Sequence, residues 1–231
     1  MLVSCRPASF AAVSAYRAAV IADGAVGYWR LGEASGTVAV DEIGAAHNGI
    51  YEGSPTLGAT GLITGDLNTA ATFAGANDVA ITVSTTILLA SDFSLECWIK
   101  TNNAGLNTLV FGTYSGTSNS GHGIGIYLTN VFVAFDGVGA FIVSTPSIAD
   151  NAKHHLCCTF TGVSPNVTGR VYFDGALVGT SASRSITAGG VLTIASYAGA
   201  GGGFSGTMDE CAIYNSVLTP TQILNHYNLG V

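Results

Sequence analysis

The chain has 231 residues, of which 48% are hydrophobic and 9% are charged, and it contains 31 glycines. Globular proteins carry about 25% charged residues, so this composition excludes a disordered chain, a coiled coil and a solvated helical bundle. Seven basic and 14 acidic residues give a net charge of −7 without a basic cluster, so nucleic-acid binding is not expected. Polar residues and glycine interrupt every apolar run before it reaches about 18 residues, so no transmembrane helix is expected.

Residues 1–13 are expected to form an N-terminal arm in front of one domain that spans residues 14–231. Arg6, Pro7 and Arg17 interrupt the apolar run that a signal peptide would need, so we expect either a chain that is made in a cytoplasm and stays there until the host cell breaks, or a chain whose N-terminus has been trimmed. Ser14 is expected to cap a short helix that extends to Ala22 and is closed by glycine 24. No linker and no internal repeat divides the rest of the chain.

Strand signals dominate the middle of the chain. Phe93–Lys100 alternates strictly, with Phe93, Leu95, Cys97 and Ile99 on one face. Further strands are predicted at residues 155–161, 170–173, 176–180, 191–195 and 210–214. Asp-Gly pairs fall between apolar runs at 136–137 and 174–175, and the second pair predicts a two-residue hairpin turn, because both central residues of such a turn need positive φ. Many short strands with regular turns predict an all-β fold, an antiparallel two-sheet sandwich.

A second helix is predicted near the C-terminus. Thr219 supplies an N-cap, Pro220 occupies the first helical position and Gln222 completes a capping box. Gly230 is expected to end the helix, whose apolar residues at 223 and 227 lie one turn apart and should pack on the sandwich.

The five cysteines contain no C-x-x-C spacing, so a zinc knuckle or a redox motif is not supported. They are Cys5, Cys97, Cys157, Cys158 and Cys211. Adjacent residues 157 and 158 would point to opposite faces of a strand and could not bridge each other there. We expect buried reduced thiols, except that Cys5 in the arm could link to a neighbouring subunit.

An ordered set of segments resembles the laminin-G-like, concanavalin A-like lectin/glucanase superfamily over about residues 16–231. The set comprises Ala25–Glu33, Ser35-Gly36, Asp41, His47–Gly49, Ala71–Gly75, Asn77-Asp78, Phe93–Lys100, His154-His155, Tyr172–Gly175, Phe204–Glu210, Ala212–Asn215 and His226-Tyr227. The resemblance implies a jelly roll of a dozen or so strands. It also implies binding of glycans or proteins and, in many members, a structural Ca²⁺. Members occur as modules of secreted bacterial enzymes and as parts of phage virion proteins.

One position departs from the family pattern. An aromatic residue often precedes the His-His pair, and here that residue is Lys153, so a ligand contact made by that aromatic is not expected. His154 and His155 lack the spacing of a zinc site, and we expect them to have hydrogen-bonded structural roles.

The acidic residues do not match a hydrolase. Retaining hydrolases of this fold place two carboxylates about 5.5 Å apart on one strand, and the chain has no Asp or Glu pair at i, i+2. Asp209 and Glu210 are neighbours and should face opposite ways, whereas Asp92 and Glu96 would lie roughly 13 Å apart along a strand. We therefore expect no enzymatic activity.

A Ca²⁺ site is predicted at Asp41, Asn48 and Asp209, because calcium needs several hard oxygen ligands around one point. Loop carbonyl oxygens near residue 44 would complete it. The alternative is that Asp41 caps its own turn and that Asp209 accepts backbone hydrogen bonds.

Glycan binding would use loop aromatics that stack on sugar faces, together with amide groups. The predicted glycan-binding residues are Tyr51, Asn103, Tyr114, Asn119, Tyr197 and Phe204. The uncharged loops of residues 101–122, which are rich in asparagine, are the favoured location. Trp29 and Trp98 are expected to be packing residues.

Together these features predict a non-enzymatic structural protein of a phage virion, at the tail or the capsid surface, whose lectin-like domain attaches to host-surface glycan. The expected partners are other virion proteins and copies of the chain itself, with no nucleic acid and no membrane insertion. The alternative is a secreted bacterial carbohydrate-binding or adhesion module, which would be extracellular.

Overall fold

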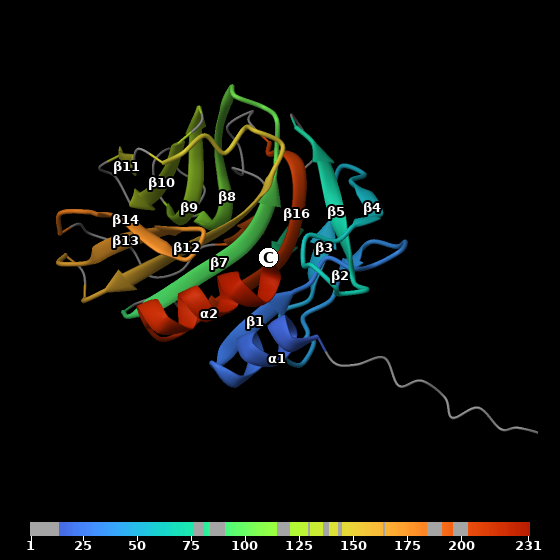
Figure 1. Cartoon of the computed structure of the whole chain (residues 1–231), viewed down its shortest axis with the longest axis horizontal. Helices are drawn as coiled ribbons and strands as arrows, with labels where there is room; N and C mark the ends of the chain where they lie inside the picture. Colours follow the sequence, from blue (N-terminus) through green and yellow to red (C-terminus); the bar gives the residue numbers. More distant parts are fainter. Residues whose placement is uncertain are drawn as a thin grey trace, which may run out of the picture.

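The computed structural model describes residues 14–75, 81–83, 91–114, 121–128, 130–135, 139–142, 145–163, 165–183, 191–195 and 203–231. They form two antiparallel β-sheets that pack face to face, with two helices on the outside of one sheet (Figure 1). The all-β sandwich predicted from the sequence is confirmed. No helix among these residues is long and apolar enough to cross a membrane.

The sheet that carries both helices, here the helix-covered sheet, has the order β14-β13-β12-β7-β16-β5-β4, and β1 pairs with the second half of β16. Its strands are β1 (Ala25–Trp29), β4 (Thr56–Thr60), β5 (Thr69–Ala74), β7 (Phe93–Lys100), β12 (Lys153–Thr161), β13 (Thr168–Phe173), β14 (Ala176–Thr180) and β16 (Ser205–Tyr214).

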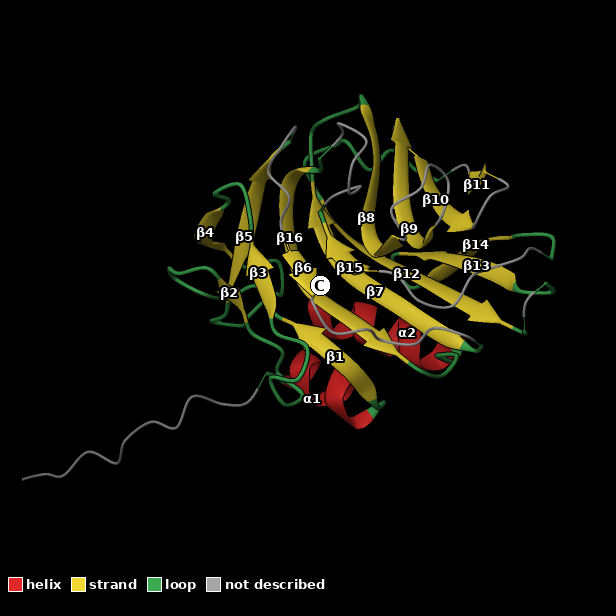
Figure 2. Cartoon of the chain, turned by 180° about the vertical axis from the view of Figure 1, so that it is seen from behind, coloured by secondary structure: helices red, strands yellow, loops and turns green. Residues whose placement is uncertain are grey.

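The second sheet has the order β11-β10-β9-β8-β15-β6-β3-β2. Its strands are β2 (Val38–Ala39), β3 (Gly49–Tyr51), β6 (Ile81–Val83), β8 (Leu106–Tyr114), β9 (Gly121–Leu128), β10 (Asn130–Phe135), β11 (Gly139–Ile142) and β15 (Val191–Ile194). Figure 2 shows this sheet in front of the helix-covered sheet.

The alternation of β7 divides its side chains between two environments. Phe93, Leu95, Cys97 and Ile99 belong to the core between the sheets, as predicted. Trp98 points the other way, into a second apolar cluster beneath the helices. Every residue from Phe93 to Ile99 is buried, so β7 is covered on both faces.

Both helices start as their sequences predict. Ser14 caps α1 (Ala15–Ala22) by accepting the amide of Arg17, and Thr219 forms a capping box with Gln222 at the start of α2 (Pro220–Gly230). In the second apolar cluster Ile223 is fully buried and Tyr227 stacks on Trp98, with 6.0 Å between the ring centroids.

Other local predictions are also confirmed. Asp174 and Gly175 both have positive φ and join β13 to β14 as a hairpin. The four described cysteines are free and buried. Cys5, the arm of residues 1–13 and the Asp-Gly pair at 136–137 lie outside the described residues.

Candidate functional site

A buried polar network lies between β7 and the two helices. Glu96 is fully buried, and Nδ1 of His226 in α2 lies 3.0 Å from both of its carboxylate oxygens. Nε2 of His155 in β12 lies 3.0 Å from Oε2, and Tyr214 donates its hydroxyl to Oε1. Nε2 of His226 lies 3.0 Å from Asp23, which follows α1. The network therefore ties both helices to the sheet.

Glu96 and His226 of this network favour each other's charged forms through their pKa values. Burial alone would raise the pKa of Glu96, but the adjacent His226 and His155 hold that pKa well below its ordinary range. Burial would lower the pKa of His226, yet Glu96 and Asp23 raise it. His154 contacts carboxylates of Asp150 and Asp174. Both histidines of the pair are hydrogen-bonded, which fits the structural role predicted for them.

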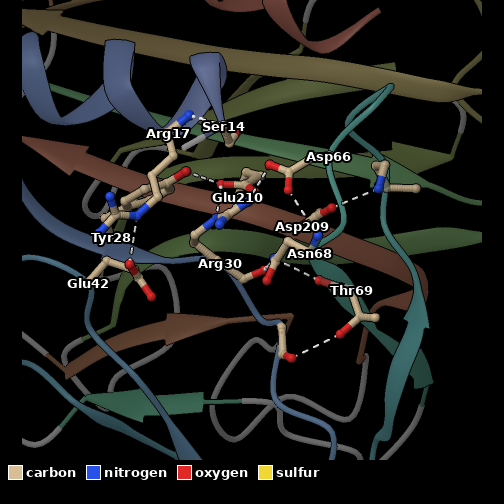
Figure 3. Close-up of polar contacts among 12 residues, drawn as sticks. Ser14, Arg17, Tyr28, Arg30, Glu42, Asp66, Asn68, Thr69, Asp209 and Glu210 are labelled. Carbon is tan, nitrogen blue, oxygen red and sulfur yellow. Dashed lines mark hydrogen bonds and ion pairs between the residues drawn. The ribbon is translucent and has the colours of Figure 1, made fainter. Parts of the chain in front are cut away.

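A second buried cluster is centred on Arg30 (Figure 3). Its Nε and Nη2 atoms donate to Oε1 of Glu210 at 2.9 and 2.8 Å, and Nη2 also donates to Asp66 at 2.5 Å. Tyr28 donates its hydroxyl to the same glutamate. Because Glu210 belongs to β16 and Asp66 to the loop of residues 61–68, Arg30 fastens that loop to the sheet.

A β-bulge corrects the prediction that Asp209 and Glu210 face opposite ways. The register with β7 shifts between Asp209 and Ala212, and Glu210 has a φ of +54°. Both carboxylates therefore turn toward the helix side of the sheet (Figure 3), where Asp209 accepts the amide of Leu62 at 2.7 Å. Burial, and then the adjacent Glu210, raises the pKa of Asp209 well above its ordinary range.

The loop of residues 61–68 forms one wall of a groove of about 570 Å³, which is also lined by the end of β7, the start of β12 and the start of β16. This volume lies within the usual range of small-molecule sites. The residues used below are Thr64, Lys100, Asn102, Asn151, Lys153 and Gly206. We refer to this cavity as the dilysine groove.

Contacts between distant segments shape the dilysine groove. Lys153 donates to Oγ1 of Thr64 at 2.6 Å and to the carbonyl oxygen of Gly230, at the end of α2, at 2.7 Å. The amide of Thr64 donates to the same carbonyl oxygen at 3.1 Å. A Cβ atom at Gly206 would lie 2.5 Å from the carbonyl oxygen of Lys100, so only glycine allows this close approach of β16 to β7.

Unpaired polar groups distinguish the dilysine groove from other cavities. Within the described residues, the side-chain amides of Asn102 and Asn151 have no hydrogen-bond partner, and both residues are exposed. A neighbouring cavity of about 690 Å³ is lined by Arg30 and Asp66, but these two side chains already bind each other. The dilysine groove is therefore our candidate functional site.

The predicted glycan-binding residues do not form one site. Asn103 adjoins the groove, where its Oδ1 accepts the amide of Gly105 at 2.9 Å. Tyr51 is 7% exposed, donates to Glu33 and lines a separate cavity of about 400 Å³. The expectation of an exposed aromatic at Phe204 is wrong, because its ring is fully buried in the core between the sheets. The side chain of Tyr114, and residues Asn119 and Tyr197, lie outside the described parts.

The predicted calcium ligands have other hydrogen-bond partners. Oδ1 of Asp41 accepts the amides of Tyr28 and Ile43 at 3.0 Å, and Asn48 accepts the amide of Asp41 at 2.8 Å. This is the turn-capping alternative. Asp209 keeps one buried oxygen without a partner among the described residues. In the same part of the chain, no three His, Cys, Asp or Glu side chains gather as a metal-binding group. These contacts fit turn capping better than calcium binding, and calcium here stays a prediction.

Several structurally important residues were not singled out from the sequence. A signal existed for Glu96, because strand alternation places it on the same face of β7 as Trp98, opposite the face in the core between the sheets. Arg30 and Lys100 offered no local signal, since their surroundings come from strands and loops far along the chain.

This geometry agrees with the comparison with known families. The sequence model of the concanavalin A-like lectin/glucanases superfamily matches residues 73–224, so the chain belongs to this superfamily. The resemblance inferred from the sequence is therefore confirmed. Among curated proteins, none matches the chain.

Solved structures share the fold at low sequence identity. Domain 4 of AbnA, a GH43 extracellular arabinanase of Geobacillus stearothermophilus solved with arabinotriose, has a TM-score of 0.61 and 17% identity, with 88% of this chain and 98% of that one covered. A Trypanosoma rangeli sialidase has a TM-score of 0.65 and 14% identity, with 88% of this chain covered. The binding domain of Paraclostridial Mosquitocidal Protein 1 has a TM-score of 0.62 and 15% identity. The alignment covers 89% of this chain and 52% of that one. The chain spans 32% of the sialidase.

Proposed function

We propose that this chain is a non-catalytic glycan-binding domain and that the dilysine groove holds the sugar. The observation that carries the proposal is a pair of side-chain amides, those of Asn102 and Asn151, which have no hydrogen-bond partner among the described residues and lie at the rim of a cavity of about 570 Å³. An amide both donates and accepts hydrogen bonds, so it suits the hydroxyl groups of a sugar. The AbnA domain, which was solved with arabinotriose, supports the same class of ligand.

The state of the buried acids supports binding without catalysis. Glu96, Asp209 and Glu210 are at most 1% exposed, and each is engaged by histidine, arginine, tyrosine or a backbone amide. A hydrolase would need two carboxylates that reach the scissile bond. We propose instead that these acids hold the loop of residues 61–68 and the helices that shape the groove.

The experiment is a glycan-array screen of the full chain followed by calorimetry on the best ligand. Asn102→Ala and Asn151→Gly should each weaken binding at least about tenfold, which corresponds to about 1.4 kcal/mol. Glycine is used at 151 because Asn151 has a φ of +64°. Asn225→Ala, on the exposed surface of α2, is the matched control. Binding that survives both groove substitutions would contradict the location, and no binding to any glycan would contradict the function.

For its biological setting we propose a phage virion surface, with a secreted bacterial adhesion module as the alternative. An exposed apolar pair supports contact with another protein. Val38 and Ile50 are register partners on β2 and β3 and are 46% and 52% exposed. Crosslinking mass spectrometry on native particles tests this setting. Crosslinks from this edge to another copy or to a virion protein are expected, whereas recovery as a free monomer from culture medium would favour the exported module.

Calcium at Asp41, Asn48 and Asp209 remains a secondary proposal. Melting temperatures measured with calcium and with a chelator test it, and identical values would contradict a structural ion.

A further inference from the structure

Both lysines of the chain line the same groove. The sequence contains only Lys100 and Lys153, in a protein whose net charge is −7. They come from neighbouring strands, β7 and β12, on which they are direct register partners. Like charges directly opposite each other in an antiparallel pair are destabilising. The fold therefore concentrates positive charge here at a cost in stability.

Neutral groups surround the Lys153 ammonium. It donates to the Thr64 hydroxyl and the Gly230 carbonyl oxygen, and it lies 5.6 Å from the centre of the Trp98 ring. Partial burial lowers the pKa of Lys153. Among the described residues, no carboxylate lies within ion-pair distance of either lysine. The two ammonium groups therefore lack a counter-charge from this part of the protein.

Lys100 is the more available of the two. Within the described residues its ammonium has no hydrogen-bond partner, and its side chain is half-buried at the groove. Gly206, which also lines the groove, approaches the backbone of Lys100 closely. An anionic group that entered the groove could contact Lys100 directly while Lys153, fixed by Thr64 and Gly230, supplies a second positive charge.

We propose that the dilysine groove binds an acidic sugar, whose carboxylate lies between the ammonium groups of Lys100 and Lys153. The side-chain amides of Asn102 and Asn151 then contact its hydroxyl groups. This inference rests on the proposed glycan-binding function and specifies the class of sugar. The carboxylate supplies the counter-charge that the described residues do not provide, and the attraction falls as salt screens it.

The experiment compares matched ligands by calorimetry with the full chain. The probes are sialyllactose against lactose, trigalacturonic acid against galactotriose, and sulfated lactose. At least one carboxylated sugar should bind at least about tenfold more tightly than its neutral partner, and added salt should weaken that binding. Lys100→Met should abolish the preference, and Lys100→Arg should keep most of it. Arg170→Met, which removes one positive charge outside the groove, should leave it unchanged.

Each other outcome contradicts a specific part of the proposal. If neutral sugars bind as tightly as acidic ones and Asn102→Ala weakens their binding, the acidic specificity is wrong and the glycan-binding function stands. If only the sulfated sugar gains affinity, the assignment to a carboxylate is wrong. If the acidic preference survives Lys100→Met in a variant with an unchanged melting temperature, the charge is recognised elsewhere. If no sugar binds, both proposals fail.

Discussion

Nδ1 of His226 lies 3.0 Å from both carboxylate oxygens of Glu96, although the two residues are 130 positions apart in the chain. This contact joins the C-terminal helix to the central strand of the helix-covered sheet. It also holds the end of that helix near Lys153, which binds the carbonyl oxygen of Gly230. This buried ion pair therefore connects the packing of α2 on the sheet with the groove.

Glu96→Gln should lower the free energy of unfolding by about 3 kcal/mol, because removing one partner of a buried ion pair leaves the other charge uncompensated. Urea unfolding monitored by tryptophan fluorescence measures it. Glu52→Gln, the same change at an exposed residue, should alter the free energy by less than about 0.5 kcal/mol. Equal effects of the two substitutions would show that the network contributes no net stability.

His226 predicts a pH dependence of stability. Its pKa in the folded protein is raised above the ordinary value, mainly by Glu96 and Asp23 against the effect of burial. The stabilisation from its protonated form is complete below about pH 6.5 and is lost as the pH rises through the raised pKa. The stability difference between the wild type and His226→Gln should therefore shrink from pH 6 to pH 9. A difference that is constant over this range would contradict the ion-pair role.

Asp209 predicts a second pH dependence of stability, which substitutions at this residue test. Burial and Glu210 raise its pKa, so the folded state favours the protonated form and loses stability as the pH rises above the ordinary range of aspartate. Asp209→Asn keeps an oxygen for the Leu62 amide and cannot ionise. Its stability relative to the wild type should therefore increase with pH. Asp209→Ala, which removes the acceptor, should be less stable than Asp209→Asn at every pH.

Gly206→Ala should destabilise the protein by about 1–3 kcal/mol and reduce ligand binding. The residue has a φ of +150°, and a Cβ atom there would lie 2.8 Å from the ring of Phe204 as well as against the Lys100 carbonyl oxygen. Thermal unfolding and calorimetry measure the two effects. Gly44→Ala is the control, because a Cβ atom there meets nothing within 4 Å. An unchanged ligand affinity of the Gly206→Ala variant would show that this backbone position does not belong to the binding site.

Local patterns in the sequence predicted much of the fold. The alternation of residues 93–100 placed one face in the core, and Thr219, Pro220 and Gln222 identified the start of α2. These signals lie within a few residues of each other, so they need no knowledge of the tertiary structure. The ordered family segments then supplied the jelly-roll topology, which no single strand could determine.

The candidate site was harder to predict, because it depends on register. Lys100 and Lys153 are neighbours only because β7 pairs with β12. The turn of Glu210 toward Arg30 depends on a bulge that shifts the pairing of β16. Phe204 was expected at the surface because it falls beside a loop in the sequence, but its ring is fully buried in the core between the sheets, where a Cβ atom at Gly206 would lie 2.8 Å from it. Long-range strand pairing, rather than composition, decided these positions.

The reactivity of the four described cysteines can report which part of the molecule unfolds first. Cys97, Cys158 and Cys211 belong to the core between the sheets, whereas Cys157 belongs to the cluster beneath the helices. All four are fully buried, and burial raises the pKa of Cys157 and Cys158 well above the usual range, so each thiol should react only after local exposure. In a Cys5→Ser background, early labelling of Cys157 alone would report detachment of the helices. Simultaneous labelling of all four would report opening of the whole sandwich in one cooperative step.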